Sequence, residues 1–398
     1  MSRWFAFGLS LVVAALVVSH VVQPLSGAGE PLRTVEHYVR LKSTAPAITG
    51  QMAHLYVRER MTDDVLRSAN LGDRVVLMVH GAGTPAEVAF DVPYGDYSWM
   101  GYLARAGFDV FAMDMTGYGR STKPSPMDDP CNLTREQQMS SVARMLAAPC
   151  APSYTGDVST IRSDWDDINA VVDHIRALRH VDKVSLVAWS QGGARAGGFT
   201  VKHPEKVNRL VVLAPMSIVA AAPAGSAPGN AAGIVSSTAA AAGAPFSTQS
   251  HAEFTANWNR QVGCPAQYDP VVSDAIWQDM QASDPVGATW GPGVRRASNA
   301  RRGAGDWDAT AAANLKVPTL LVSGVHDKQV DPASVRQLHA ALGATDKVFI
   351  DLGCSSHNAM WEKNHLELFE ASRQWLATGA VNGTKSGTLR LGYGTSER

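Results

Sequence analysis

The sequence predicts an α/β fold: a doubly wound, mostly parallel sheet with an inserted cap. Two observations carry this prediction. Short apolar segments alternate with amphipathic ones along most of the chain, which is typical of right-handed β–α–β crossovers. One of them, Val75–Val79, has no polar residue at all, as expected of a strand buried on both faces of a parallel sheet. A third observation predicts an insertion between two strands of the sheet, because an uncharged stretch of small residues at 218–244 interrupts the alternation.

Composition narrows the class of protein. The chain has 398 residues, of which 35 are basic and 36 acidic, for a net charge of −1. This balance argues against nucleic acid as a partner, because binding phosphates requires a basic excess. Hydrophobic residues make up 45% of the chain, so it can bury a large core and wholesale disorder is excluded.

The N-terminal segment has the pattern of a secretory signal peptide. A basic start at Arg3 precedes an apolar run over 5–22, and the small residues Ser26 and Ala28 suit a cleavage site. We therefore predict a signal peptide over 1–28 and a secreted or periplasmic mature chain with no stable membrane span. The alternative is an uncleaved anchor, since a span needs about 20 apolar residues and this run is close to that length.

The four cysteines agree with an oxidising compartment. None forms a C-x-x-C pair, so zinc binding and thioredoxin-like chemistry have no support. Cys131 and Cys150 bracket one local segment and are the expected pair, which leaves Cys264 to pair with Cys354. The alternative is that some of them are buried thiols.

The expected elements divide into two parts of one core. The first part spans 29–215, and the second spans 305–376 after the predicted cap at 216–304. A tail at 377–398, rich in Gly, Ser and Thr, is expected to be flexible. The expected strands are 35–41, 51–58, 75–79, 108–113, 184–188, 210–213, 317–323 and 348–352. The expected helices are 97–105, 163–178, 306–315, 332–341 and 366–376.

The strongest chemical signal is the turn Ala188-Trp189-Ser190-Gln191-Gly192. A buried strand ends there, a small-x-Ser-x-Gly turn follows, and a helix begins directly afterwards. This is the pattern of a nucleophile elbow, in which a strained turn presents the serine hydroxyl at the carboxyl edge of the sheet. We predict Ser190 as a nucleophile.

A serine hydroxyl needs a general base, and the base needs an orienting acid. Asp327 lies in the loop after a late strand, whereas the competing Asp331 stands before Pro332 and has the pattern of a helix N-cap. His357 lies in the loop after the last predicted core strand. The sequence therefore predicts a triad of Ser190, Asp327 and His357.

Two backbone N–H groups would bind the oxyanion that this chemistry produces. One is that of Gln191, directly after the nucleophile. The other is expected in the loop His80-Gly81-Ala82-Gly83 after the third strand, where Ala82 is the predicted donor and small residues allow close approach. His80 is expected to brace this loop, because the triad needs only one imidazole.

These motifs resemble those of the α/β-hydrolase superfamily, in its capped serine esterase or lipase-like branch. The resemblance spans about 35–376 and includes the 80–83 loop, the 114–121 turn, the elbow, the Asp327 loop and His357. It implies an α/β-hydrolase fold with a cap over the site, a structural role for Asp114, and hydrolysis of a small-molecule or lipid-like ester through an acyl-enzyme.

Other functions remain open at this point. A peptidase or amidase would use an acidic cap residue to bind a substrate amine, and an acyltransferase would exclude water; a non-catalytic binding protein on the same scaffold is the remaining class. The acidic candidates are Glu253, Asp269, Asp274, Asp279 and Asp284. No metal, nucleotide or flavin motif is apparent, so no cofactor is predicted.

No substrate-binding residue can be assigned from the sequence. Five aromatic residues of the cap could line a pocket, but most are expected to form the cap's own core: Phe246, Phe254, Trp258, Trp277 and Trp290. The pairs Arg295-Arg296 and Arg301-Arg302 could attract an acidic substrate, but we expect them to be solvated surface.

Overall fold

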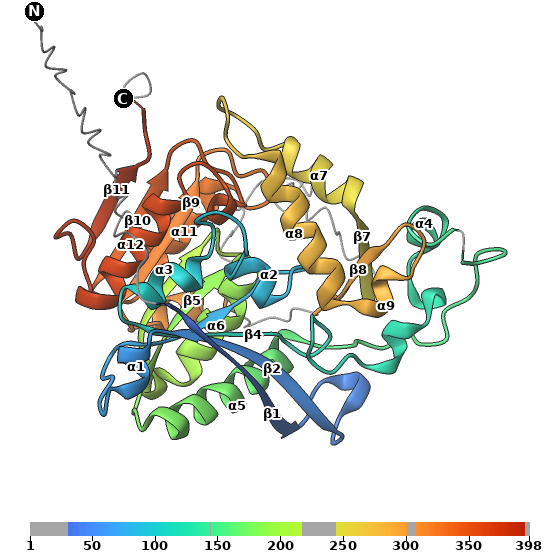
Figure 1. Cartoon of the computed structure of the whole chain (residues 1–398), viewed down its shortest axis with the longest axis horizontal. Coiled ribbons are helices and arrows are strands. Elements are labelled where there is room, and N and C mark those ends of the chain that lie inside the picture. The colour runs from blue at the N-terminus through green and yellow to red at the C-terminus, as the bar shows by residue number, and fades with distance from the viewer. Residues whose placement is uncertain (1–30, 144, 217–243, 301–306, 395–398) are drawn as a thin grey trace, which may run out of the picture.

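The structure is a computed structural model that describes residues 31–143, 145–216, 244–300 and 307–394 (Figure 1). The predicted signal peptide, nearly all of the uncharged stretch and the pair Arg301-Arg302 lie outside these residues. Within them, none of the helices is long and apolar enough to cross a bilayer.

A mostly parallel sheet forms the centre of the molecule, which confirms the predicted fold class. Its strand order is β1-β2-β4-β3-β5-β6-β9-β10-β11, and only β1 and β2 run antiparallel to their neighbours. The strands are β1 (Arg33–Lys42), β2 (Met52–Met61), β3 (Val75–Val79), β4 (Asp109–Met113), β5 (Val184–Trp189), β6 (Val207–Leu213), β9 (Thr319–Gly324), β10 (Lys347–Leu352) and β11 (Gly387–Leu391).

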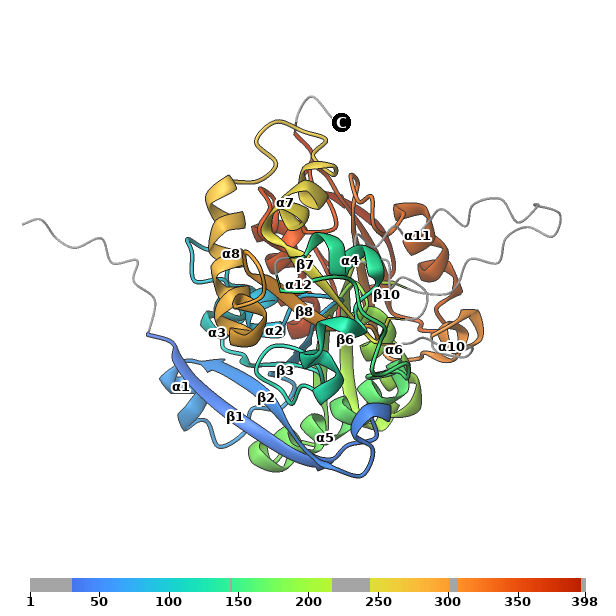
Figure 2. The same cartoon turned by 90° about the vertical axis from the view of Figure 1, so that its right-hand side faces the viewer.

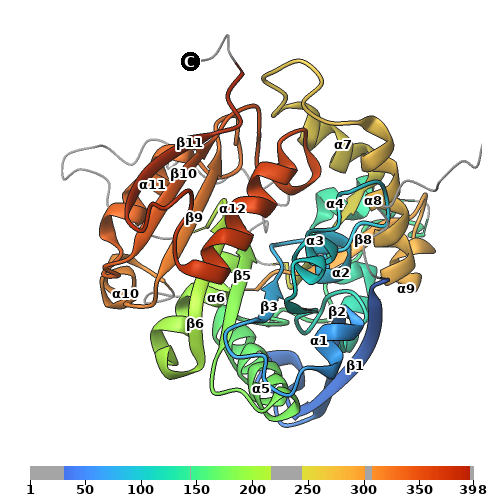
Figure 3. The ribbon, with the colours of Figure 1, turned by 60° about the vertical axis from the view of Figure 1, so that its left-hand side comes forward.

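Helices cover both faces of this sheet. One face packs against α5 (Ile161–Arg179), α6 (Gly192–Lys202), α10 (Ala309–Asn314) and α11 (Pro332–Ala341). The other packs against α2 (Ala86–Phe90), α3 (Trp99–Arg105) and α12 (His365–Thr378), with α12 in front of the strands in Figure 3. A short helix, α1 (Asp63–Arg67), follows β2.

The sequence of β3 explains why both faces are covered. Leu77 belongs to the apolar cluster on the α5 and α6 side, and its neighbour Met78 belongs to the cluster on the α3 and α12 side. Because side chains alternate along a strand, an entirely apolar strand must bury both of its faces. The carboxyl ends of the parallel strands therefore meet at one edge, where connecting loops can assemble a site.

An inserted segment lies in the chain between β6 and β9, two strands that pair directly with each other in the sheet. Its elements are β7 (Phe246–Ser250), α7 (His251–Asn259), α8 (Pro270–Ser283), α9 (Pro285–Ala288) and β8 (Val294–Ser298), and β7 pairs with β8 as a separate antiparallel sheet. Figure 2 shows this sheet beside α4 (Arg135–Ser140). Phe246 and Trp290 pack with apolar residues of the 127–158 region, whereas Phe254, Trp258 and Trp277 join the cluster of the α12 face.

The prediction that residues 377–398 form a flexible tail is wrong for the central part of this segment. Gly387–Leu391 form β11, an edge strand that pairs in parallel with β10. The Gly, Ser and Thr content of the tail concealed the alternation of Leu389 and Leu391, whose side chains pack against the apolar cluster of the α12 face. Backbone pairing and this apolar contact together hold the strand in place.

Both predicted disulfides are confirmed. Cys131 and Cys150 close a local loop with a Cα–Cα distance of 5.3 Å. Cys264 and Cys354, which are 90 residues apart, have a Cα–Cα distance of 5.6 Å and join the inserted segment to the loop after β10.

Candidate active site

Ser190 lies in the sharp turn between β5 and α6. Its φ of +59° is in the left-handed region, a strained conformation for a residue with a Cβ. The turn is held by neighbouring backbone, because the Ser190 N–H donates to Leu213 O at 2.9 Å and the Met216 N–H donates to Ser190 O at 2.9 Å. A Cβ on Gly192 would lie 2.4 Å from Val79 O, which explains the small residue required two positions after the serine.

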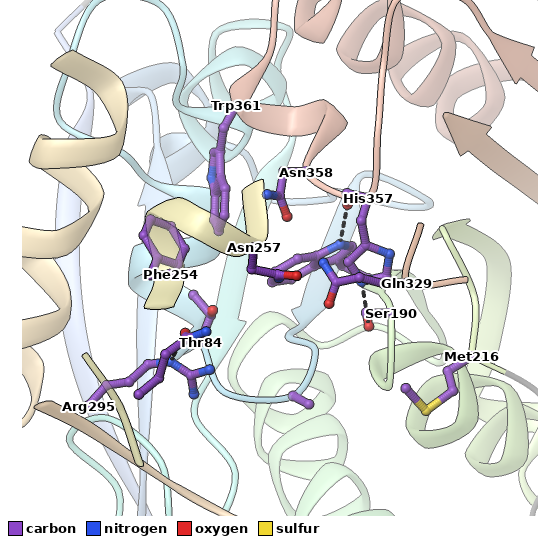
Figure 4. A pocket seen from close by; sticks show the side chains of 13 residues that line it. Thr84, Ser190, Met216, Phe254, Asn257, Arg295, Gln329, His357, Asn358 and Trp361 are labelled. Atoms are coloured by element: carbon purple, nitrogen blue, oxygen red, sulfur yellow. Dashed lines mark hydrogen bonds between the residues drawn. The ribbon is translucent and has the colours of Figure 1, made fainter. Parts of the chain in front are cut away.

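The three residues of the predicted triad lie in one hydrogen-bonded chain. His357 Nε2 is 2.8 Å from Ser190 Oγ, a contact drawn in Figure 4. On the other side of the ring, His357 Nδ1 is 2.8 Å from Asp327 Oδ2. All three side chains are buried. With the ring proton on Nδ1, the imidazole donates to the carboxylate and accepts from the serine hydroxyl, which is the arrangement that a general base requires.

Asp327 is fixed by its second oxygen, which accepts from the N–H groups of Gln329 and Val330 at 2.7 and 2.8 Å. Asp331, the competing acid, accepts from Ala333 N–H and caps α11, as its position before Pro332 predicted. The helix-capping pattern in the sequence therefore distinguished the role of Asp327 from that of Asp331, although the two lie only four residues apart.

Two backbone N–H groups near Ser190 have no acceptor among the described residues: those of Ala82 and Gln191. Gln191 precedes the first residue of α6, where helix geometry leaves the N–H without a partner. A Cβ on Gly81 would lie 2.9 Å from Ser190 Cβ, so the 80–83 loop passes directly beside the serine. A buried donor without a partner is costly unless a bound group supplies the acceptor.

A buried network of hydrogen bonds holds the 80–83 loop in place. It includes Arg195, which the sequence analysis missed. His80 Nδ1 is 2.7 Å from Gly81 O, and its Nε2 accepts from Met115 N–H at 3.1 Å. Arg195 donates to the carbonyl groups of His80 and Gly81 and pairs with Asp164 at 2.7 Å, with both side chains fully buried. Burial lowers the pKa of His80 well below its ordinary value, so its ring stays neutral.

Asp114, to which the resemblance gave a structural role, accepts from the N–H groups of Ala86 and Arg120 at 2.8 and 2.9 Å. Burial raises the pKa of Asp114 to about 6. It connects the β4 turn to the start of α2 and does not line the pocket beside Ser190.

A second network joins the inserted segment to the loop of His357. The Glu362 carboxylate accepts from Trp258 Nε1 at 2.8 Å and from Ser356 N–H and Oγ at 2.6 Å. Burial raises the pKa of Glu362. Together with the Cys264–Cys354 disulfide, this network fixes the loop just before His357. A buried glutamate on a loop has no sequence signature, so this contact could not be predicted.

Residues from both the core and the inserted segment line the pocket at Ser190. They are Ala82, Thr84, Trp189, Ser190, Met216, Gln249, Phe254, Asn257, Arg295, Gln329, His357, Asn358 and Trp361. Of the five cap aromatics, only Phe254 belongs to this lining. The other four are packing residues, but the prediction that they form a core of the cap's own is wrong, because they share apolar clusters with residues of the hydrolase core.

The charged residues of the inserted segment are arranged differently from the expectation. Arg295 and Arg296 are buried, so their prediction as solvated surface is wrong. The side chains of these two residues of β8 reach the core, where Arg295 donates to Gly83 O and Arg296 to Met127 O, and Arg296 also pairs with Asp284 and Asp128. None of the five acidic candidates lines the described pocket. Glu253, Asp269 and Asp284 instead cap helices.

Within the described ranges, no group of three or more His, Cys, Asp or Glu side chains could hold a metal ion. The arrangement that is present can activate a serine hydroxyl, hold a developing negative charge with two N–H groups and protonate a leaving group. This is the chemistry of acyl transfer.

The fold and the site together define an α/β-hydrolase, of the serine hydrolase type. The chain belongs to the family described as serine aminopeptidase, S33, whose sequence profile matches residues 72–364.

The chain is also similar to two known proteins. A curated relative, 2-hydroxy-6-oxo-6-(2'-aminophenyl)hexa-2,4-dienoic acid hydrolase of Metapseudomonas resinovorans, is 29% identical over 147 residues. The matched part covers 36% of this chain and 36% of the relative, so the chain spans only about a third of the length of that relative. The solved serine hydrolase CCSP0084 of Cycloclasticus zankles is 10% identical with a TM-score of 0.52, covers 86% of this chain and 98% of its own, and supports the fold alone.

Proposed function

We propose that the protein is an exported serine hydrolase that cleaves a carboxylic ester through Ser190, His357 and Asp327. The observation that carries the proposal is the hydrogen-bonded chain from Ser190 Oγ through His357 to Asp327, with both contacts at 2.8 Å. The strained backbone at Ser190 supports it further, because such strain at a buried serine is typical of a nucleophile elbow.

In this mechanism Ser190 Oγ attacks the ester carbonyl as its proton passes to His357 Nε2. Asp327 holds the Nδ1–H and stabilises the imidazolium that forms. The N–H groups of Ala82 and Gln191 donate to the oxyanion of the tetrahedral intermediate. His357 then protonates the departing alcohol, and water activated by the same imidazole hydrolyses the acyl-enzyme.

Export is supported by the N-terminal pattern of residues 1–28 and by the two disulfides, since disulfides persist in oxidising compartments. N-terminal sequencing of the exported protein should begin at Gly29. A mature chain that still carries Met1 would contradict cleavage.

The peptidase alternative receives less support from the pocket. A site for a substrate amine needs a carboxylate, and none of the described lining residues is acidic. An ester requires no such group.

The test is hydrolysis of p-nitrophenyl acetate, butyrate and octanoate by the oxidised chain from Gly29. The Ser190→Ala variant should lose all turnover, and Asp327→Asn should lower kcat by about 10³–10⁴-fold because the imidazole loses the orientation that the carboxylate imposes. Thermal unfolding of both variants checks that they fold. Turnover that survives in folded Ser190→Ala would contradict the proposal.

A further inference from the structure

Arg295 is a buried guanidinium without a carboxylate partner in the described part of the chain. Only 6% of the residue is exposed. Its Nε donates to Gln249 Oε1 at 2.9 Å, and its Nη1 donates to Gly83 O at 2.6 Å, so both protein partners are neutral. Arg296, the next residue on β8, is instead paired with two aspartates. Within the described part of the chain, carboxylates therefore compensate the charge of Arg296 but not that of Arg295.

The guanidinium of Arg295 lies in the pocket of Ser190. Arg295 belongs to the pocket lining, and Figure 4 shows its side chain extending from β8 toward Thr84. The core loop is shaped around it, because a Cβ on Gly83 would lie 2.1 Å from Nη1 and 2.3 Å from Nη2. No acceptor for Nη2 is found among the residues that the structure describes, so this end of the guanidinium remains available to a bound molecule.

The electrostatics of the site favour an anion. Burial lowers the pKa of Arg295 to about 10, so the side chain is still protonated at neutral pH. Tyr118 and then Glu253 act against this lowering of the pKa of Arg295, but the Glu253 carboxylate accepts from Ser250 N–H and Oγ at the start of α7 and makes no ion pair with Arg295 among the described residues. A buried charge without a counterion is expensive in free energy. A ligand that brings a carboxylate into the pocket would remove that cost.

Thr84 supplies a second polar group at the same place. It is 4% exposed, directly follows Gly83 and lines the pocket, and its hydroxyl makes no hydrogen bond to any other described residue. A guanidinium and a hydroxyl that line the same pocket can both donate to the oxygens of a carboxylate.

We propose that Arg295 and Thr84 form an anion subsite that binds a carboxylate carried by the ester substrate. The inference rests on the proposed function and names its substrate class: half-esters of short dicarboxylic acids. In the alternative, Arg295 is only a clamp that holds Gly83 in place, and the charge of the substrate is irrelevant.

The position of the subsite limits the length of the substrate. Arg295 binds the carbonyl of Gly83, and Gly83 directly follows Ala82, whose N–H faces the proposed oxyanion. Two residues of chain span at most about 7 Å. The carboxylate and the scissile carbonyl should therefore be separated by only a few carbon atoms.

The experiment compares charged and neutral esters of equal length. The substrates are the monoethyl esters of succinate, glutarate and adipate and the matched ethyl esters of butyrate, valerate and hexanoate, followed by pH-stat. The readout is the ratio of kcat/KM for each charged ester to that for its neutral partner. A charge-assisted contact predicts a ratio of about 10–100 for the best pair in the wild type.

Three variants test whether Arg295 produces this ratio. Arg295→Gln should bring it close to 1, and Arg295→Lys should give an intermediate value because it keeps the charge without the planar fork. Arg296→Gln is the matched control, and it should leave the ratio unchanged even if it lowers stability. A ratio near 1 in the wild type, or an equal ratio in Arg295→Gln, would overturn the subsite.

Binding of glutarate separates this inference from the proposed function. Calorimetry should show that glutarate binds the wild type at least tenfold more tightly than the neutral glutaramide does, and that Arg295→Gln removes this difference. If no ester is hydrolysed but the difference is present, the esterase proposal fails and the subsite stands. If esters are hydrolysed and glutarate binds no better than glutaramide, only the subsite fails.

Discussion

At the scale of single residues, the site depends on polar groups that are buried with their partners. Asp164 and Arg195 are fully buried and form an ion pair with one another, and Arg195 in turn donates to two carbonyl groups of the 80–83 loop. Asp167, one helical turn further along α5, has no such cation among the described residues, where it accepts from Thr116 N–H at 3.0 Å. Its ionisation is therefore unfavourable in the folded protein.

Asp167 gives a prediction about pH. Burial raises its pKa from the ordinary 3.8 to about 7, so between these values the folded chain binds a proton that the unfolded chain has lost. Stability must then fall as pH rises through this window, by at most about 4 kcal/mol for a shift of this size. Asp167→Asn removes this loss while it keeps an acceptor for Thr116. Urea unfolding between pH 4 and 8 should show the variant gaining stability relative to the wild type as pH rises. Parallel pH profiles would contradict the raised pKa.

At the scale of elements, α6 is built for close packing behind the elbow. Four of its residues are glycines, and neighbouring tryptophans occupy the space that side chains would need. A Cβ on Gly197 would lie 2.3 Å from Trp307, and one on Gly198 would lie 2.2 Å from Trp165. This proximity sets the position of the helix that Gln191 directly precedes.

We predict that Gly198→Ala destabilises the protein although alanine is the better helix former. Helix propensity favours alanine by about 1 kcal/mol, but overlap with Trp165 should cost more, for a net loss of about 1–3 kcal/mol in the free energy of unfolding. Denaturant titration measures this loss. In a double-mutant cycle, Trp165→Leu should reduce the cost of Gly198→Ala because it vacates the space. Additive effects would show that the overlap is not the cause.

At the scale of the whole molecule, the inserted segment and the core share one site through covalent and polar ties. The Cys264–Cys354 disulfide joins them three residues before His357, and Glu362 adds hydrogen bonds to both. The Cys131–Cys150 disulfide closes a loop of 19 residues within the core. The two bridges should therefore have different effects on activity.

Replacing Cys264 and Cys354 together by alanine should lower stability by about 4–5 kcal/mol in the loop-entropy model for a separation of 90 residues. It should also lower kcat, because the loop of His357 is released. The matched control replaces Cys131 and Cys150, with an expected loss of about 3 kcal/mol and a smaller effect on kcat. For each double variant, thermal unfolding measures the loss of stability and p-nitrophenyl butyrate hydrolysis measures kcat. Equal effects on kcat would contradict the link between this bridge and His357.

Local sequence patterns predict much of this architecture. Particular residues show where prediction from such patterns fails. The apolar run of Val75–Val79 and the Pro332 start of α11 gave element bounds that the structure reproduces. β11 was missed because an edge strand of five residues depends on pairing with β10 more than on its own composition. The burial of Arg295 and Arg296 was missed because local sequence contains no information on what packs against β8.

The sequence by itself determined the fold class and the three residues that come together at Ser190, and it favoured, without fixing, the two disulfide pairings that the structure contains. These follow from periodicity, from the order of loops at the carboxyl edge of a parallel sheet, and from helix-capping rules that separate Asp327 from Asp331. The tertiary structure alone decided which charges the pocket contains. It placed Arg295 beside Gly83, more than 200 residues away in the chain. It also turned the acidic residues of the inserted segment away from the described pocket. The physical reason is that burial and charge compensation depend on contacts between distant segments, which no local pattern records.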